Sequence, residues 1–235
     1  MKRYVVCLKY GTKYSPDYVN KLHNMVKRNL TLSYEFVCFT ECAKGLDKDI
    51  RVEPLSQIEG VHGWWYKPMF FNPNLPIKGT ILFLDLDLII FRNIDHLFTH
   101  NPGRLQVIRD FNRKVIKNYP KFNSSVVRFD TGKHRQVYTE FMKNPADVCR
   151  RFLGDQDWLY HQVKSDFDYW PEEWIQSYKW EMRNRPALDR SRPKGARDFT
   201  ENAEPTVLPG TSIAVFHGDP NPHICKDEWV WQNWY

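Results

Sequence analysis

Long apolar runs and paired-cysteine motifs are what this sequence of 235 residues lacks. No segment approaches the roughly 18–20 apolar residues that span a bilayer. The apolar run that follows Lys2 and Arg3 is only YVVCL, which is too short for the core of a signal peptide. The cysteines number five, and none stands in a CxxC pattern, which disfavours a disulfide framework or a zinc knuckle. We therefore expect a cytoplasmic protein with mostly buried thiols.

The charge balance favours anionic partners. The sequence has 34 Lys and Arg against 28 Asp and Glu, which gives a net charge of +6 and a pI near 9.0. Such a surface suits nucleotides, phosphosugars, anionic lipid or nucleic acid. No recognised nucleic-acid motif occurs, so we expect no nucleic-acid partner. An apolar fraction of 42% is enough for one sizeable core, and we expect residues 1–235 to form a single domain.

The order of segments predicts an α/β fold. Residues 3–8 read as a buried strand, residues 15–30 as a helix that starts at Ser15-Pro16, and residues 34–39 as a second strand. A strand–helix–strand start is typical of a mostly parallel sheet. We expect further strands at 50–55, 80–84, 105–109, 125–129, 174–180 and 211–217, and helices at 63–71, 94–98, 134–143 and 155–163.

Two aspartates interrupt the apolar run TILFLDLDLIIFR at residues 80–92. A buried carboxylate is costly unless it is paired, so Asp85 and Asp87 need an explanation. In extended chain, residues two apart point the same way. Two carboxylates on one side, at the carboxyl end of a strand, make a hard oxygen site that suits Mg²⁺ or Mn²⁺ and a diphosphate. The alternatives are that the aspartates cap the following turn, or that Asp85 is the nucleophile of a phosphatase of the haloacid dehalogenase type.

Three other segments carry polar side chains that fit such a site. GDQDWL (154–159) places carboxylates at a predicted helix start, where they could equally be caps. HGDPNPH (217–223) puts His217 at the end of a strand, as a metal ligand or a structural histidine. FNSSVVRF (122–129) begins a strand with small polar residues that suit sugar hydroxyls or a turn.

The order DxD, NSS, GDQDW, SYK and strand-HG resembles bacterial and viral glycosyltransferases of the GT-A type, and it is most similar to the loosely glycogenin-like group around family 8. The resemblance spans nearly the whole chain. It implies a Rossmann-like GT-A domain with a mixed, mostly parallel sheet. It also implies a nucleotide-diphosphate-sugar donor, Mn²⁺ or Mg²⁺, retention of anomeric configuration, and a glycan, lipid-linked or protein acceptor with at most peripheral membrane contact.

The resemblance also implies roles for individual residues. Asp85, Asp87 and His217 match the metal ligands, and Asp85 also matches a donor contact. The positions that match other donor contacts are Lys9, Tyr10, Thr40, Lys67, Asn123, Ser124, Ser125 and Lys179. The DQD residues Asp155, Gln156 and Asp157 are the candidates to stabilise an oxocarbenium-like sugar, and the sequence does not separate their roles.

The turn after His217 departs from the family pattern. Relatives usually carry Lys or Arg there, where this chain has Asp219 and Asn221. We expect Lys179 or an arginine of residues 183–197 to supply the missing cation beside the leaving diphosphate.

Two segments of the sequence each allow two interpretations. Residues 181–205 read either as a solvated loop or as an acceptor-side segment. The tail EWVWQNWY carries Trp229, Trp231 and Trp234, which either dock by burying their indoles or bind sugars or a membrane surface. If the tail binds sugars and the chain has no catalytic activity, the protein is a non-catalytic sugar- or nucleotide-binding module.

Overall fold

The computed structural model describes residues 1–114, 116–183 and 204–235. Its main element is a sheet of seven strands in the order β3-β2-β1-β4-β7-β6-β8. Every pairing in this sheet is parallel except the two that β7 makes. The strands are β1 (Arg3–Lys9), β2 (Glu35–Thr40), β3 (Arg51–Pro54), β4 (Thr80–Leu84), β6 (Gln106–Arg109), β7 (Phe122–Asp130) and β8 (Asp168–Tyr169).

A second sheet has three strands in the order β5-β10-β9. Its members are β5 (Leu88–Ile90), β9 (Ile175–Ser177) and β10 (Ile213–Val215). The run at residues 80–92 is therefore not one strand. It forms β4 in the first sheet and β5 in the second, and a bend at Asp85–Asp87 joins them. The two aspartates lie at the junction between the sheets.

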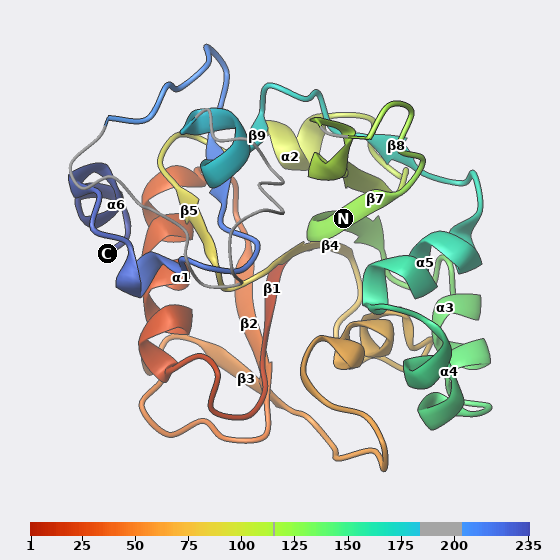
Figure 1. The fold of residues 1–235 in the computed structure, drawn as a ribbon. Coiled ribbons are helices and arrows are strands. Elements are labelled where there is room, and N and C mark those ends of the chain that lie inside the picture. Colours follow the sequence, from red (N-terminus) through yellow and green to blue (C-terminus); the bar gives the residue numbers. More distant parts are fainter. Residues whose placement is uncertain (115, 184–203) are drawn as a thin grey trace.

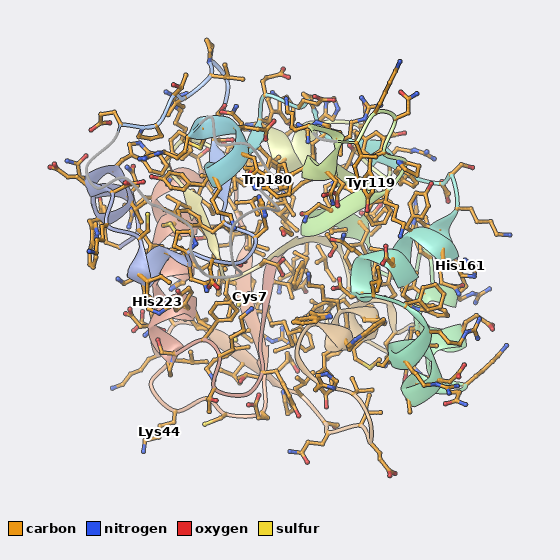
Figure 2. The ribbon with its side chains drawn as sticks, in the orientation of Figure 1. Cys7, Lys44, Tyr119, His161, Trp180 and His223 are labelled. Carbon is orange, nitrogen blue, oxygen red and sulfur yellow. The ribbon has the colours of Figure 1, made fainter. Side chains whose placement is uncertain are left out.

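Apolar side chains cover both faces of the seven-stranded sheet. On β1, Val5 and Cys7 face the core that contains α1, whereas Tyr4 and Val6 face the other core. Figure 2 labels Cys7 within the molecule. A strand that is buried on both faces reads as a continuous apolar run, which explains the sequence RYVVCLK.

Helices form the outer layers (Figure 1). Helices α1 and α6 contribute to one core, and α3, α4, α5 and the 3₁₀ helix η1 contribute to the other. The α-helices are α1 (Pro16–Asn29), α2 (His96–Thr99), α3 (Gln136–Phe141), α4 (Pro145–Arg151), α5 (Asp155–Val163) and α6 (Glu228–Asn233). Shorter helical segments are η1 (Gly63–Phe71), η2 (Phe111–Lys114), η3 (Tyr178–Met182) and η4 (Pro222–Ile224).

The strand expected at 174–180 is shorter than predicted. It ends at Ser177, whose side-chain oxygen accepts a hydrogen bond from the Trp180 backbone N–H and so caps the π-helical turn η3. Most of the segment 181–205 falls outside the described residues, and its two readings stay predictions. Within the part that is described, no helix is long and apolar enough to cross a membrane.

Candidate active site

A cavity of about 280 Å³ opens at one edge of the main sheet. The carboxyl ends of β1 and β4 meet there because these strands are parallel, and the start of β7 joins them because β7 is antiparallel. The lining residues are Leu8, Tyr10, Lys13, Tyr14, Gly63, Trp64, Lys67, Asp85, Leu86, Asp87, Asn123, Ser124, Ser125, Asp155, Gln156 and His217. The cavity therefore gathers ten of the fourteen residues that the sequence singled out.

Lys67 lies at the centre of a buried polar network. Its ammonium nitrogen is 2.9 Å from Asp85 Oδ1 and 3.4 Å from Asp155 Oδ2. It also donates to Ser124 Oγ at 3.2 Å, and that hydroxyl donates to Asp155 Oδ2 at 2.7 Å. The network joins η1, the bend after β4, the start of β7 and the first turn of α5.

The charges of this network shift one another's proton affinity. Burial alone would lower the pKa of Lys67, but the carboxylates of Asp155 and Asp85 outweigh it, so its pKa is raised. Burial raises the pKa of Asp155, and the Lys67 charge opposes that effect. Lys67 is therefore held as a cation between two carboxylates.

Asp87 is more buried than Asp85. It is 8% exposed, and its Oδ2 accepts a hydrogen bond from the Tyr14 hydroxyl at 3.2 Å. Burial and the nearby Asp85 charge raise the pKa of Asp87. Two like charges that face one cavity make a site to which a hard dication is suited.

His217 reaches the same cavity from the end of β10, in a turn with a positive φ of 24°. Its Nε2 lies 2.5 Å from Ser177 Oγ, and its ring stacks on Phe111 with 5.0 Å between the centroids. Trp180, labelled in Figure 2, packs edge-on against the ring. These contacts fix the imidazole on the wall of the cavity that Asp85 and Asp87 also line.

The three predicted metal ligands line the same cavity, but their ligand atoms do not all lie within 4.8 Å of one another. Among the described residues, only one group of three acidic, His or Cys ligand atoms lies within 4.8 Å of one another, and it does not include Asp85, Asp87 or His217. The donor set nevertheless fits Mn²⁺ or Mg²⁺, because it offers two carboxylates, the kind of oxygen ligand that both ions prefer.

Lys179 supplies positive charge at the turn after His217, where the family pattern would have a basic residue. Its ammonium nitrogen donates to the backbone oxygens of His217 at 2.9 Å and Asp219 at 2.8 Å. It is 3% exposed and is not among the residues that line the cavity. Arg183, the first of the alternative arginines, pairs with the buried Asp227 at 2.7 Å, and the others lie outside the described residues.

The structure separates the three DQD residues. Asp155 and Gln156 line the cavity, and Gln156 Nε2 donates to Asp110 Oδ2 at 3.2 Å. Asp157 faces a different cavity and pairs with Lys121 at 2.7 Å. The expectation that Asp157 shares this site needs correction, because successive residues of the first turn of α5 point in different directions.

Lys9 and Thr40 also lie outside the lining. They are register partners at the ends of β1 and β2. Lys9 donates to Gly11 O at 3.3 Å, and Thr40 Oγ1 accepts from the Cys42 N–H at 3.1 Å. Both side chains hold their own loops, and of the predicted nucleoside contacts only Tyr10 reaches the cavity.

Four polar or aromatic residues in or beside the cavity were not predicted from the sequence. Lys13 and Tyr14 line the cavity from the loop after β1, and Trp64 lines it from the first turn of η1. Asp110 is 4% exposed and directly follows β6, and burial raises its pKa. A polar residue directly after a predicted strand was the available signal for Asp110, whereas no pattern marked the other three.

Comparison with known proteins finds similarity in structure alone. The sequence matches no protein-family model and none of the curated proteins. The structure of an active-site variant of LgtC has a TM-score of 0.66 at 13% identity, covering 97% of this chain and 93% of that one. Galactosyltransferase LgtC with donor and acceptor sugar analogues gives a TM-score of 0.62 at 14% identity, with the same coverage.

The apo-form glycosyltransferase GlyE of Streptococcus pneumoniae TIGR4 has a TM-score of 0.66 at 13% identity. The match covers 99% of this chain but 60% of GlyE, so this chain spans about three-fifths of that protein's length. At such identities the likeness establishes the fold. The mixed, mostly parallel seven-stranded sheet is that of the GT-A glycosyltransferases, as the sequence predicted.

Proposed function

We propose that this protein is a metal-dependent glycosyltransferase that moves a sugar from a nucleotide-diphosphate-sugar to an acceptor hydroxyl. The observation that carries the proposal is the cavity that joins Asp85, Asp87 and His217 to Lys67, Asp155 and Gln156. The fold adds support, because the solved structures that it resembles are glycosyltransferases, one of them a galactosyltransferase. The order of motifs favours the glycogenin-like group around family 8 within that fold.

The donor diphosphate would lie against the two aspartates. Asp85 and Asp87, with His217, would hold Mn²⁺ or Mg²⁺, which when bound neutralises charge on the departing diphosphate. Lys67 and Lys13 add fixed positive charge on the cavity wall. Lys179 holds the turn of His217 by its backbone oxygens, so its charge acts from behind that turn.

The nucleoside and the sugar would occupy the two ends of the cavity. Tyr10 and Trp64 offer aromatic faces for the base, and Asn123, Ser124 and Ser125 offer small polar groups for sugar hydroxyls. We place the reacting sugar carbon beside Gln156 and Asp155, where a carboxamide and a carboxylate can stabilise oxocarbenium character. The LgtC variant above alters an active-site glutamine, which gives the role of Gln156 a parallel. We propose that the reaction retains anomeric configuration.

The acceptor is a glycan, a lipid-linked sugar or a protein, in keeping with the acceptor sugar analogue bound to LgtC. We propose a cytoplasmic enzyme with at most peripheral membrane contact. No finding favours the phosphatase reading. Asp85, its nucleophile, is instead paired with Lys67 at 2.9 Å.

A thermal-shift screen of nucleotide-diphosphate-sugars, with and without Mn²⁺, tests the proposal. The true donor should raise the melting temperature in the presence of the ion, because it binds the folded state alone. Asp87→Asn should abolish the ion-dependent part of the shift, whereas Asp17→Asn, on an exposed side chain of α1, should not. No metal-dependent shift with any donor would overturn the proposal.

Donor turnover and product stereochemistry test the rest. With the donor in hand, nuclear magnetic resonance of the product gives its anomeric configuration, and inversion would reject the retaining mechanism. Donor binding without turnover to water or to any acceptor would indicate the non-catalytic binding module instead.

A further inference from the structure

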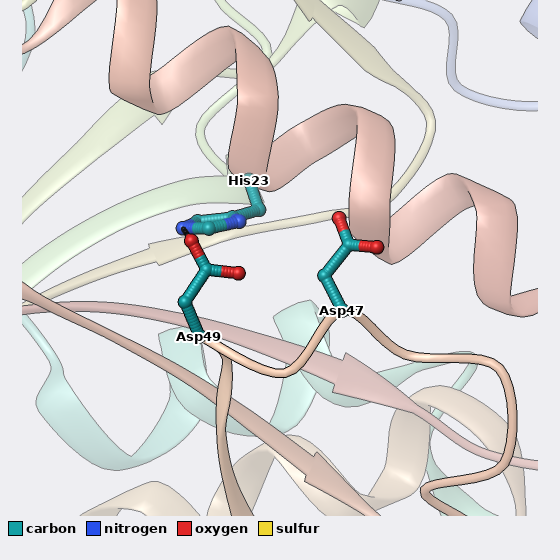
Figure 3. A group of neighbouring side chains, drawn as sticks. All are labelled: His23, Asp47 and Asp49. Atoms are coloured by element: carbon teal, nitrogen blue, oxygen red, sulfur yellow. Dashed lines mark ion pairs between the residues drawn. The ribbon is translucent and has the colours of Figure 1, made fainter.

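A second cluster of potential ligands lies away from the cavity. His23 on α1 faces Asp47 and Asp49, which lie in the connection between β2 and β3 (Figure 3). One ligand atom from each of the three lies within 4.8 Å of the others, a spacing that no other such group of described residues shows. None of the three lines the cavity. Asp47-Lys48-Asp49 is also one of the Asp-x-Asp patterns in the sequence.

The imidazole of His23 has a ring nitrogen with no hydrogen-bond partner among the described residues. Its side chain is 7% exposed, and its ring packs on Phe36 with 4.9 Å between the centroids. Its Nδ1 is buried and has no hydrogen-bond partner among the described residues. Its Nε2 is 3.9 Å from Asp49 Oδ2, beyond hydrogen-bond length. Buried polar atoms nearly always form hydrogen bonds or bind a ligand. The ring of His23 therefore needs a partner from outside the described residues.

The backbone holds the two aspartates against α1. The Asp47 N–H donates to Asn20 Oδ1 at 3.0 Å, and Asn20 Nδ2 donates to Gly45 O at 2.9 Å. The Ile50 N–H donates to Asp47 O at 3.1 Å, and the Ile50 side chain is buried. The backbone that carries the two aspartates is therefore held near His23 by contacts in which their carboxylates take no part.

Lys27, a cation beside this cluster, does not neutralise it firmly. Lys27 Nζ is 3.9 Å from Asp49 Oδ2, and the two side chains are 68% and 60% exposed. Ion pairs between exposed side chains contribute little to stability. A dication could displace Lys27, and the exposed side of Asp49 leaves room for water to complete a coordination sphere.

We propose that His23, Asp47 and Asp49 form a second cation site, which takes Zn²⁺ and ties the β2–β3 connection to α1. One imidazole nitrogen and two carboxylate oxygens are ligands that Zn²⁺ accepts, with water at the fourth position. Mg²⁺ prefers oxygen ligands, and no diphosphate would add oxygens here as it would at the donor site, so Mg²⁺ should bind more weakly than Zn²⁺. The site is separate from the proposed donor site and does not depend on the proposed reaction.

Calorimetric titration with Zn²⁺ tests the site in the full chain without nucleotide. All proteins carry Cys42→Ser, so that this exposed thiol does not compete for the ion. The test variant adds Asp47→Asn and Asp49→Asn. The matched control adds Asp17→Asn and Asp166→Asn, which remove two carboxylates whose side chains are 61% and 63% exposed.

The test variant should lose one equivalent of Zn²⁺, or bind it at least tenfold more weakly, whereas the control should match the parent. Both variants should keep the melting temperature of the parent in chelator. Equal stoichiometry and affinity in the test variant and the control would overturn the site.

The ring nitrogens of His23 give an independent readout. Their ¹⁵N resonances, identified by their absence in His23→Phe, should shift on addition of one equivalent of Zn²⁺ but not of Mg²⁺. Unshifted His23 nitrogens would exclude the imidazole as a ligand, even if Zn²⁺ bound elsewhere. These outcomes are unaffected if no nucleotide-sugar binds, so this proposal and the proposed function can fail separately.

Discussion

Lys67 Nζ lies 2.9 Å from Asp85 Oδ1, and the same ammonium lies 3.4 Å from Asp155 Oδ2. One lysine therefore bridges the bend after β4 and the start of α5. Lys67→Met would leave two carboxylates without their cation. Breaking a fully buried ion pair typically costs about 3–5 kcal/mol. The Lys67 and Asp85 side chains are 13% and 24% exposed, so we expect a smaller loss in the free energy of unfolding measured with urea.

A double variant separates charge from packing. In the Lys67→Met background, Asp155→Asn should recover part of the lost stability, because it removes one of the carboxylates left unpaired. Strictly additive costs of the two substitutions would contradict a coupled network. Transfer activity should stay low in both variants, since the fixed charge facing the donor phosphates is gone.

Tyr14 positions Asp87 by a hydrogen bond of 3.2 Å. Tyr14→Phe keeps the ring and removes only the hydroxyl, so we expect a stability loss of about 1 kcal/mol. Groups that orient metal ligands typically change metal affinity by about 10–100-fold when removed. Mn²⁺ affinity measured by calorimetry should fall within that range. Tyr138→Phe, on α3 and outside the cavity, is the matched control, and an equal fall in both variants would contradict the role.

Asp87 should cost the protein stability when it is ionised. Burial and the Asp85 charge raise its pKa, so the folded chain binds that proton more tightly than the unfolded chain does. Its contribution to stability is thus greatest below the ordinary Asp pKa, near 4, and is lost as the pH rises through the raised value. Without metal at pH 7, Asp87→Asn should therefore melt higher than the wild type. A gain of about 1 kcal/mol corresponds to about 2–4 °C in a chain of this size.

The metal should reverse that order. Mn²⁺ should raise the melting temperature of the wild type and leave that of Asp87→Asn unchanged. The stability of Asp87→Asn without metal should also vary less with pH above 4. A variant that melts below the wild type in chelator would show that the carboxylate stabilises the fold instead.

The DQD residues should differ sharply in kinetics. Gln156→Ala removes a carboxamide that lines the cavity, and we expect kcat to fall by about 10²–10³-fold, the usual loss for one stabilising group. Asp157→Asn breaks only the partly exposed pair with Lys121, so kcat and KM should stay within about twofold of the wild type. A comparable loss of kcat in Asp157→Asn would contradict the separation seen here.

The sequence predicted β1, β2, β4, β6 and β7 of the main sheet because strands buried on both faces leave plain apolar runs, as in β1 and β4. It also predicted the half-exposed β3, but it did not predict the two-residue strand β8. It could not show that the run at 80–92 divides between two sheets, since β4 and β5 are equally apolar and pairing partners are set by distant chain. Asp85, Asp87 and Asn123 followed from their place at strand ends.

The direction of a side chain at a helix start was beyond the sequence. Asp155 and Asp157 have the same chemistry, and only the packing of α5 decides which one meets Lys67. Lys67 itself follows an aromatic run, and its position between two carboxylates depends on how η1 packs beneath β4. The cluster around His23 went unnoticed because its members come from a helix and a loop that carry no shared pattern.

Trp231 in α6 and Trp234 just after it should respond differently to substitution by alanine. Trp234 is 4% exposed and packs on the Tyr18 ring with 4.8 Å between the centroids. Its indole nitrogen has no hydrogen-bond partner in the described part of the chain, so it contributes through packing and through the Lys21 ammonium, which lies 3.9 Å from the centroid of its ring. Trp234→Ala should therefore cost about 3–5 kcal/mol of unfolding free energy.

Trp231 is 57% exposed, and its indole N–H donates to Cys225 O at 3.0 Å. Trp231→Ala should lose only that hydrogen bond and partial packing, about 1 kcal/mol. Urea unfolding of the two variants measures the difference. A docked tail requires the cost at Trp234 to be clearly the larger, because an indole that serves only an outside surface could be truncated without loss of fold stability. Equal small costs at both positions would mean that the tail does not rely on buried indoles and would return the surface-binding reading.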